Sequence, residues 1–214
     1  MALNIDTSEF QFFLRTVTIN IKRLINKCID LYNSMFQITP ESAQEIHTER
    51  GDDLMKKGNY DGAIKAFRSV LLTDQSNADV LLKLGRIYTL RGLNSEAVEV
   101  LRTLTGIDEQ IPEAFYLLGS AYFACDNNSE AENTLNLAVA LNPSYAEAYY
   151  KLGLIADARD DHDTAITAYL KTINMRPDYI KAYQNLGFAY EAKGLRDEAV
   201  KYFKKSMEME QRNC

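Results

Sequence analysis

The chain has 214 residues, of which 46% are hydrophobic and 25% charged, and its formal net charge is −6. The first 43 residues carry four basic and four acidic side chains, so the excess negative charge lies in the rest of the chain. An acidic chain without a basic stripe argues against nucleic acid as a ligand. The three cysteines, Cys28, Cys125 and Cys214, are scattered and odd in number, which favours a reducing compartment over a disulfide framework.

The beginning of the chain does not resemble a secretion signal. Asp6 and Glu9 stand where a signal peptide would carry basic residues, and no small-residue cleavage site follows. No uncharged run reaches the roughly 18 residues that a membrane-spanning helix needs. We therefore expect a cytoplasmic protein whose association with a membrane, if it has one, is peripheral.

Residues 1–43 form an apolar segment with helical spacing, which predicts an amphipathic helix. The β-branched residues between 16 and 21 could break this helix into two, and Pro40 is expected to end the segment. The expected self-assembly stripe consists of Phe10, Phe13, Leu14, Val17, Ile21, Leu24, Cys28, Leu31 and Met35.

Three destinations are open for this segment, because a lone helix with so much apolar surface is not stable in water. It could pack on the following residues of its own chain as a cap. It could lie in a groove of a neighbouring copy, which would make the protein a homo-oligomer. It could also bind a membrane surface with the help of Lys22, Arg23 and Lys27.

From Gln44 onward the sequence repeats every 34 residues, most clearly in Ala146–Tyr179. A shift of 34 in either direction superimposes Gly153 on Gly187 or on Gly119. A period of this length predicts a stacked array of one supersecondary unit. The five copies are expected at residues 44–77, 78–111, 112–145, 146–179 and 180–213, without insertion or deletion.

Each copy contains two apolar runs with three- and four-residue spacing, which predict a pair of amphipathic helices joined by a polar turn. Gly58, Gly92 and Gly194 occupy this turn in three copies, and Asp126 and Asp160 take the same place in the other two. The copies therefore predict an all-α array of helical hairpins stacked into a superhelix.

Copies two to five also share a glycine inside the first helix, where glycine costs about 1 kcal/mol relative to alanine. Because four copies carry this unfavourable glycine at the same position, the sequence predicts that the two helices of each hairpin approach closely there, with an alanine of the second helix as the partner. The expected pairs are Gly85 with Ala97, Gly119 with Ala131, Gly153 with Ala165, and Gly187 with Ala199.

The two ends of the array depart from this regularity. His47 and Arg50 stand at positions of the first copy where other copies have large apolar residues, which leaves the packing of that copy open. Met207 and Met209 stand where a following helix would normally pack. We therefore expect the C-terminal end to expose apolar surface.

The pattern over residues 44–213 resembles the tetratricopeptide repeat (TPR) family. Large or aromatic residues fill the family's tryptophan position in four copies, and His47 fills it in the first; the four are Leu81, Phe115, Tyr149 and Tyr183. The resemblance implies a right-handed superhelical solenoid of five TPR hairpins. Within the family, the plan of an apolar leader and five uninterrupted repeats resembles the magnetosome-associated TPR proteins, as does the stretch YIKAYQNLGFAYEAKGLRDEAVKYFKK.

In TPR proteins the first helix of each hairpin lines a concave groove that binds partner proteins. The resemblance implies that the groove here is an apolar, aromatic floor with Glu113 and Glu147 at its edge. The asparagine that carboxylate-clamping TPR proteins use is replaced by Ser120, Leu154 and Phe188, so that binding mode is not expected. The expected groove residues are Leu82, Arg86, Thr89, Tyr116, Ser120, Phe123, Tyr150, Leu154, Asp157, Gln184, Phe188 and Glu191.

No combination of residues points to catalysis, a metal or a cofactor. His47 and His162 fall at non-equivalent positions of the repeat, and neither has a second ligand at metal-binding spacing. We expect a non-enzymatic scaffold that self-assembles through residues 1–43. The resemblance further implies a coat on the cytoplasmic face of the magnetosome membrane that recruits other magnetosome proteins.

The alternative is a monomeric adaptor whose groove binds an amphipathic helix of a client protein. The two functions differ in oligomeric state. If the groove binds the leader of another copy, a charge at Tyr150 or Phe188 is expected to reduce assembly and to leave folding largely intact.

Overall fold

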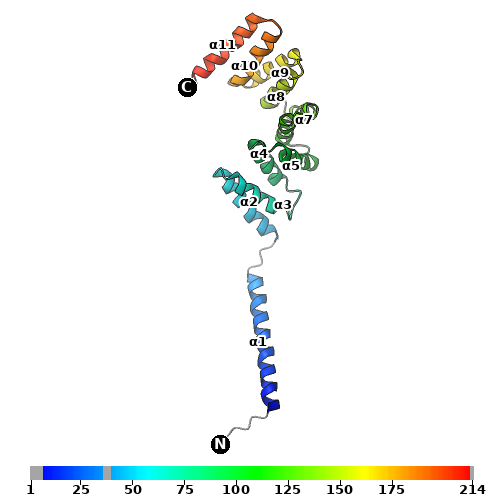
Figure 1. Ribbon diagram of the computed structural model, residues 1–214, viewed down its shortest axis with the longest axis vertical. Helices are drawn as coiled ribbons and strands as arrows, with labels where there is room; N and C mark the ends of the chain where they lie inside the picture. The colour runs from blue at the N-terminus through cyan, green and yellow to red at the C-terminus, as the bar shows by residue number, and fades with distance from the viewer. Residues whose placement is uncertain (1–6, 36–39, 213–214) are drawn as a thin grey trace. The chain divides into compact units, whose positions relative to one another are not determined.

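The computed structural model describes residues 7–35 and 40–212, with side chains described for residues 15–29, 31 and 41–212. All regular secondary structure in these residues is α-helical (Figure 1). The helices are α1 Thr7–Met35, α2 Pro40–Lys56, α3 Tyr60–Leu71, α4 Ala78–Leu90, α5 Asn94–Ile107, α6 Pro112–Ala124, α7 Asn128–Leu141, α8 Ala146–Asp157, α9 His162–Met175, α10 Ile180–Ala192 and α11 Arg196–Arg212.

The chain divides into two units, Met1–Ile46 and His47–Cys214, which are described separately. In the first unit, α1 is one unbroken helix of 29 residues, so the break that the β-branched residues between 16 and 21 could have caused does not occur. Ile21, Leu24 and Ile29 of α1 are half or more exposed, whereas Val17 is partly buried. Pro40 is the first residue of α2, a position that suits proline because its missing N–H would have no partner there.

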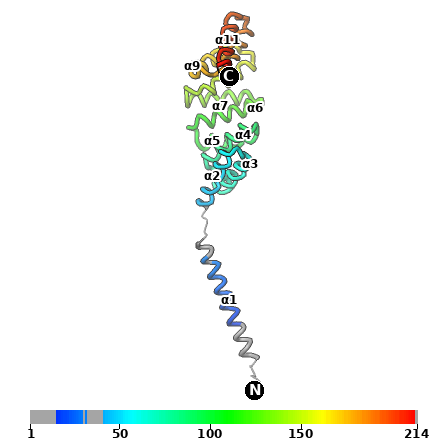
Figure 2. Tube along the Cα trace, turned by 90° about the vertical axis from the view of Figure 1, so that its left-hand side faces the viewer, coloured from blue at the N-terminus to red at the C-terminus, as the bar shows by residue number. Residues whose placement is uncertain are grey.

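From α2 onward the chain forms a right-handed superhelical solenoid of five TPR hairpins, α2–α3 to α10–α11, and the boundary between the two units falls within α2. The N-terminal amphipathic helix α1 precedes it in the sequence. The hairpins follow one another in chain order, and Figure 2 shows them as successive layers. The turn residues adopt the left-handed backbone conformation, with φ of 73° at Gly58 and of 58° and 59° at Asp126 and Asp160. The prediction that aspartate replaces glycine in these two turns is therefore confirmed.

The glycines inside the first helices do lie against the second helices, but for three of the four the partner is not the predicted alanine. A Cβ on Gly85 would be 2.4 Å from Leu101, and one on Gly153 would be 2.4 Å from Tyr169. The partner is the large residue one turn beyond the alanine, because its side chain crosses the gap that the missing Cβ leaves. The other pairs are Gly119 with Leu135, where the carbonyl oxygen of Ala131 also lies close, and Gly187 with Phe203.

The first hairpin keeps the same contact despite its unusual sequence. Gly51 of α2 is buried, and a Cβ there would be 2.4 Å from the ring of Phe67 in α3. Phe67 is itself fully buried. The hairpin therefore retains the glycine–large-side-chain contact of the later copies although His47 occupies the aromatic position.

Successive hairpins are joined by contacts that recur at one register. The residue of each first helix that faces the preceding hairpin is fully buried in hairpins two to five; these residues are Val80, Ala114, Ala148 and Ala182. A cation that follows a first helix also reaches back to the start of the preceding second helix. Arg91 pairs with Asp61 at 3.2 Å, and Lys193 pairs with Asp163 in the same way three hairpins later.

Candidate protein-binding site

The residues expected to line a groove fall on the first helices of hairpins two to five, three on each of α4, α6, α8 and α10. Their exposure differs widely. Arg86, Phe188 and Glu191 are exposed, whereas Ser120 and Tyr150 are buried. The seven others are partly buried: Leu82, Thr89, Tyr116, Phe123, Leu154, Asp157 and Gln184.

Pairs of tyrosine rings connect neighbouring first helices on this surface. Tyr116 of α6 lies 4.9 Å from Tyr145, the residue just before α8, measured between ring centroids. The same pair recurs one repeat later, with Tyr150 of α8 4.8 Å from Tyr179. Tilted aromatic pairs at this separation are favourable beyond the area that they bury. Tyr145 and Tyr179 were not among the expected groove residues, although their own 34-residue spacing was a signal for them.

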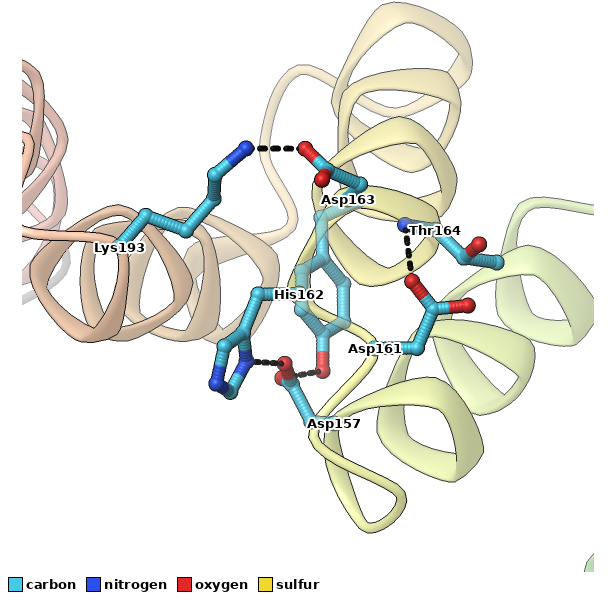
Figure 3. Close-up of polar contacts among 7 residues, drawn as sticks. Asp157, Asp161, His162, Asp163, Thr164 and Lys193 are labelled. Atoms are coloured by element: carbon cyan, nitrogen blue, oxygen red, sulfur yellow. Dashed lines mark hydrogen bonds and ion pairs between the residues drawn. The ribbon is translucent and has the colours of Figure 1, made fainter.

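Asp157 is held in place by two hydrogen-bonding side chains. The hydroxyl group of Tyr169 donates to Asp157 Oδ2 at 2.7 Å, and Nδ1 of His162 lies 3.3 Å from Oδ1 (Figure 3). The side chain of His162 is only 27% exposed because it folds back over the turn onto Asp157. The carboxylate of Asp157 is therefore engaged within its own hairpin.

The carboxylates expected at the edge of the groove are both paired with arginines. Glu113 accepts two hydrogen bonds of 2.6 Å from Arg86, one from Nε and one from Nη2, and this bidentate contact joins α6 to α4. Glu147 pairs with Arg176, whose guanidinium also lies 5.1 Å from the ring centroid of Tyr179. The edge is therefore less acidic than the sequence suggested.

Burial shifts the titration of several groups on this surface. Burial raises the pKa of Tyr179 to about 12, with a further contribution from the neighbouring Tyr116. Burial also raises the pKa of Tyr145 and of Tyr169. The ammonium group of Lys151 lies 5.4 Å from the ring centroid of Phe123, and burial, together with Lys181, lowers its pKa. Tyr145 and Tyr179, which are partly exposed, thus keep neutral hydroxyl groups, whereas the hydroxyl group of Tyr169 is buried and bonded to Asp157.

The sequence between Arg102 and Lys151, which includes α6 and α7, carries an excess of acidic residues. No lysine or arginine occurs between Arg102 and Lys151, a stretch that contains seven acidic residues. Arginines from outside the stretch, Arg86, Arg159 and Arg176, pair with three of them. Four carboxylates, Asp108, Glu109, Asp126 and Glu130, have no such arginine partner among the described residues, so the middle of the array keeps a negative charge.

Among the described residues, no helix combines the length and the apolar character needed to cross a bilayer. The same part of the chain holds no cluster of three or more histidine, cysteine, aspartate or glutamate side chains that could ligate a metal. What the surface offers is an aromatic, hydrogen-bonding area of the kind that binds other proteins.

Comparison with known families agrees with this geometry. Family models described as tetratricopeptide repeat match residues 54–111 and 138–212, and one described as TPR repeat matches residues 119–156. The stacked hairpins and these matches define a TPR protein, a class of protein-interaction scaffold. No curated protein sequence matches the chain.

Comparison with solved structures identifies the family within the TPR proteins to which the chain belongs. A crystal structure of MamA protein is 49% identical, covers 80% of this chain and 94% of that chain, and has a TM-score of 0.74. A second crystal structure of MamA is 51% identical, covers 76% and 95% of the two chains, and has a TM-score of 0.72. The chain belongs to the MamA family of TPR proteins. Residues 41 to the end of MamA from Desulfovibrio magneticus RS-1, at 24% identity, 80% and 97% coverage and a TM-score of 0.75, share the fold.

Proposed function

We propose that the chain is a non-enzymatic scaffold that self-assembles through residues 1–43, coats the cytoplasmic face of the magnetosome membrane and recruits other magnetosome proteins to it. Membership of the MamA family supports the location. The TPR array, with its aromatic surface, supports the recruitment of proteins. The main observation in favour of self-assembly is the exposed apolar face of α1.

The apolar face of α1 needs a partner surface. Ile21, Leu24, Ile25 and Ile29 are all half or more exposed and extend over more than two turns. Exposed apolar area of this extent marks a contact with another molecule or a membrane. The flanking charges of α1 include Arg15, Lys22, Arg23 and Lys27, so a partner with an excess of carboxylates is favoured.

The array of a second copy offers both features. The first helices carry the tyrosine pairs, and the carboxylates without an arginine partner, Asp108, Glu109, Asp126 and Glu130, lie in the connections and in α7 beside them. Burying about six large apolar side chains at roughly 1.5–3 kcal/mol each gives about 9–18 kcal/mol. Association costs about 4–15 kcal/mol, which leaves a difference compatible with micromolar affinity. A contact between two different surfaces propagates into an open assembly unless its rotation closes a ring.

The experiment compares the full chain with Leu24→Glu by sedimentation velocity over a range of concentrations. A charge in the apolar face of α1 is expected to shift the distribution toward monomers. Asn26→Glu is the matched control, because it adds the same charge to the exposed polar side of the helix and should leave assembly unchanged. Equal assembly of the Leu24→Glu variant and the parent would overturn the proposed role of α1.

On the array, Phe188→Glu is the corresponding change, since Phe188 is well exposed. Tyr150 is not suitable, although the sequence suggested it. Its ring is buried against Tyr169 and Tyr179, and its hydroxyl group accepts a hydrogen bond from Asn185 at 3.1 Å, so a glutamate there would disturb the fold. If the parent chain and every variant are monomers at high concentration, the chain is an adaptor for an amphipathic helix of a client protein.

A further inference from the structure

In α11, the last helix that the structure describes, the stacking face is exposed. Val200 and Met207 are 64% and 55% exposed, which agrees with the expectation from the sequence that Met207 lacks a partner. One repeat earlier, Ile166 stands at the register of Val200, is only 8% exposed, and packs in the core that includes α10. Val200 and Met207 therefore occupy the positions on which a sixth hairpin would pack.

Asp197 of α11 is in the same situation. In the array, Asp61 pairs with Arg91 and Asp163 pairs with Lys193, a cation that lies 30 residues further along the chain in both cases. Asp197 is the next residue of this series, 34 positions after Asp163. It forms no ion pair within the described part of the chain, so its carboxylate is available to a cation at the same register of another hairpin.

The first hairpin offers the complementary features. Ile46 of α2 is 53% exposed, whereas residues at its register in the later hairpins are fully buried against the preceding hairpin. Lys57, which follows α2, stands 34 positions before Arg91 and so takes the register of the pairing cation. Both Lys57 and Asp197 are exposed.

We propose that α11 of one molecule binds the first hairpin of a second copy of the chain, so that the solenoid continues from one molecule into the next. Val200 and Met207 cover Ile46 in this contact, and Asp197 pairs with Lys57 as Asp163 pairs with Lys193 within the array. The contact goes beyond the α1-mediated assembly proposed above and uses different residues of both copies.

Net charge favours the same pairing. Residues 180–214 carry seven basic and five acidic side chains, whereas residues 40–56 carry five acidic and two basic ones. Lys204 lies on the exposed face of α11 between Val200 and Met207. Asp53 of α2 takes the register of the buried Ala189, so its carboxylate would face that basic helix. The acidic α2 of a second copy is therefore a better partner for the basic α11 than α1 is, because α1 carries the basic cluster Lys22, Arg23 and Lys27.

The contact is expected to be weaker than those inside the array. Arg50 and Asp53 of α2 stand where later hairpins have the fully buried or nearly buried apolar residues Leu186 and Ala189. Polar groups at these positions reduce the apolar area buried and add a desolvation cost. A heterologous contact of this kind lets molecules add and leave at the ends of an open array.

The test uses a charge swap in the full chain, read by sedimentation velocity and supported by circular dichroism as a check of folding. Asp197→Lys and Lys57→Glu are each expected to raise the dissociation constant of this contact about three- to tenfold. Val200→Glu should raise it more than about tenfold, because it puts a charge into the apolar centre. The control is Ser95→Glu in α5, because Ser95 is exposed, takes the register of Asp197 and does not contact α11. Val98→Glu is not a suitable control, since Val98 packs against the core.

An equimolar mixture of the Asp197→Lys and Lys57→Glu variants gives the decisive result. Lysine at 197 in one variant then meets glutamate at 57 in the other, so the mixture should associate more strongly than either variant alone. No gain on mixing, or a Val200→Glu variant that assembles like the parent, would overturn the proposal.

Repeating the series in the Leu24→Glu background separates the two contacts. Loss of assembly with Leu24→Glu alone reports on α1, and the charge swap reports on α11. The α1 contact and the α11 contact can therefore be supported or refuted independently of each other.

Discussion

Gly153 in α8 lies so close to Tyr169 in α9 that a Cβ on Gly153 would be 2.4 Å from the ring carbon Cε1 of Tyr169. The ring of Tyr169 is fully buried and its hydroxyl group is bonded to Asp157, so it cannot move aside without losing that bond. The same relationship recurs between Gly187 and Phe203. This contact between a glycine and a large side chain is the unit of packing within each hairpin.

Gly153→Ala is therefore expected to lower the free energy of unfolding by about 1–3 kcal/mol, the usual cost of overpacking. Gly106→Ala in α5 is the control, because nothing lies within 4 Å of a Cβ at that position. There alanine should stabilise the helix, by up to about 1 kcal/mol. Urea denaturation of the two variants measures both changes, and a Gly153→Ala variant as stable as the parent would contradict the packing described.

The turn at Asp160 predicts a stabilising substitution. Its φ of 59° is in the left-handed region, where an L-residue other than glycine is strained. Asp160→Gly should raise the free energy of unfolding by about 0.5–1 kcal/mol. The reverse change, Gly92→Ala at φ 69°, should lower it by about 1–2 kcal/mol although nothing lies within 4 Å of the new methyl group. Thermal unfolding of the two variants measures both changes in the free energy of unfolding. Changes in the opposite directions would refute the argument that an L-residue is strained at these positions.

The buried tyrosines predict a loss of stability at alkaline pH. Burial raises the pKa of Tyr179 to about 12 in the folded state, and it also raises the pKa of Tyr145 and Tyr169, whereas an unfolded chain releases these protons near pH 10. The folded state then binds more protons than the unfolded state above about pH 10, so the free energy of unfolding falls as the pH rises toward 12. Urea denaturation at pH 8 and at higher pH measures the slope, which Tyr179→Phe should reduce. An unchanged slope in this variant would rule out Tyr179 as a source.

The Arg86–Glu113 pair predicts a modest coupling between the second and third hairpins. Its distances are short, but both side chains are more than one third exposed, so solvent screens the pair. A double-mutant cycle with Arg86→Met and Glu113→Gln should give a coupling energy of about 0.5–1 kcal/mol. The coupling should decrease in 1 M salt, where the screening length is about 3 Å. A coupling that salt does not change would mean that the contact acts through packing.

Much of the fold could be predicted from the sequence because the 34-residue period fixes which residues are equivalent. The period also identified Asp126 and Asp160 as turn residues, and their φ values confirm that. It could not identify the partner of Gly153, because whether Ala165 or Tyr169 faces the gap depends on how the two helices cross. For the same reason, the pairing of Glu113 with Arg86 and of Glu147 with Arg176 was not expected.

The most direct test of the account is the mass distribution of the parent chain and of the Leu24→Glu variant, measured by sedimentation velocity from low to high concentration. The account predicts that the parent shows species heavier than one chain that increase with concentration, and that Leu24→Glu reduces them while Asn26→Glu does not. A parent chain that sediments as a single monomeric species at every concentration would contradict the claim that the protein is a self-assembling scaffold.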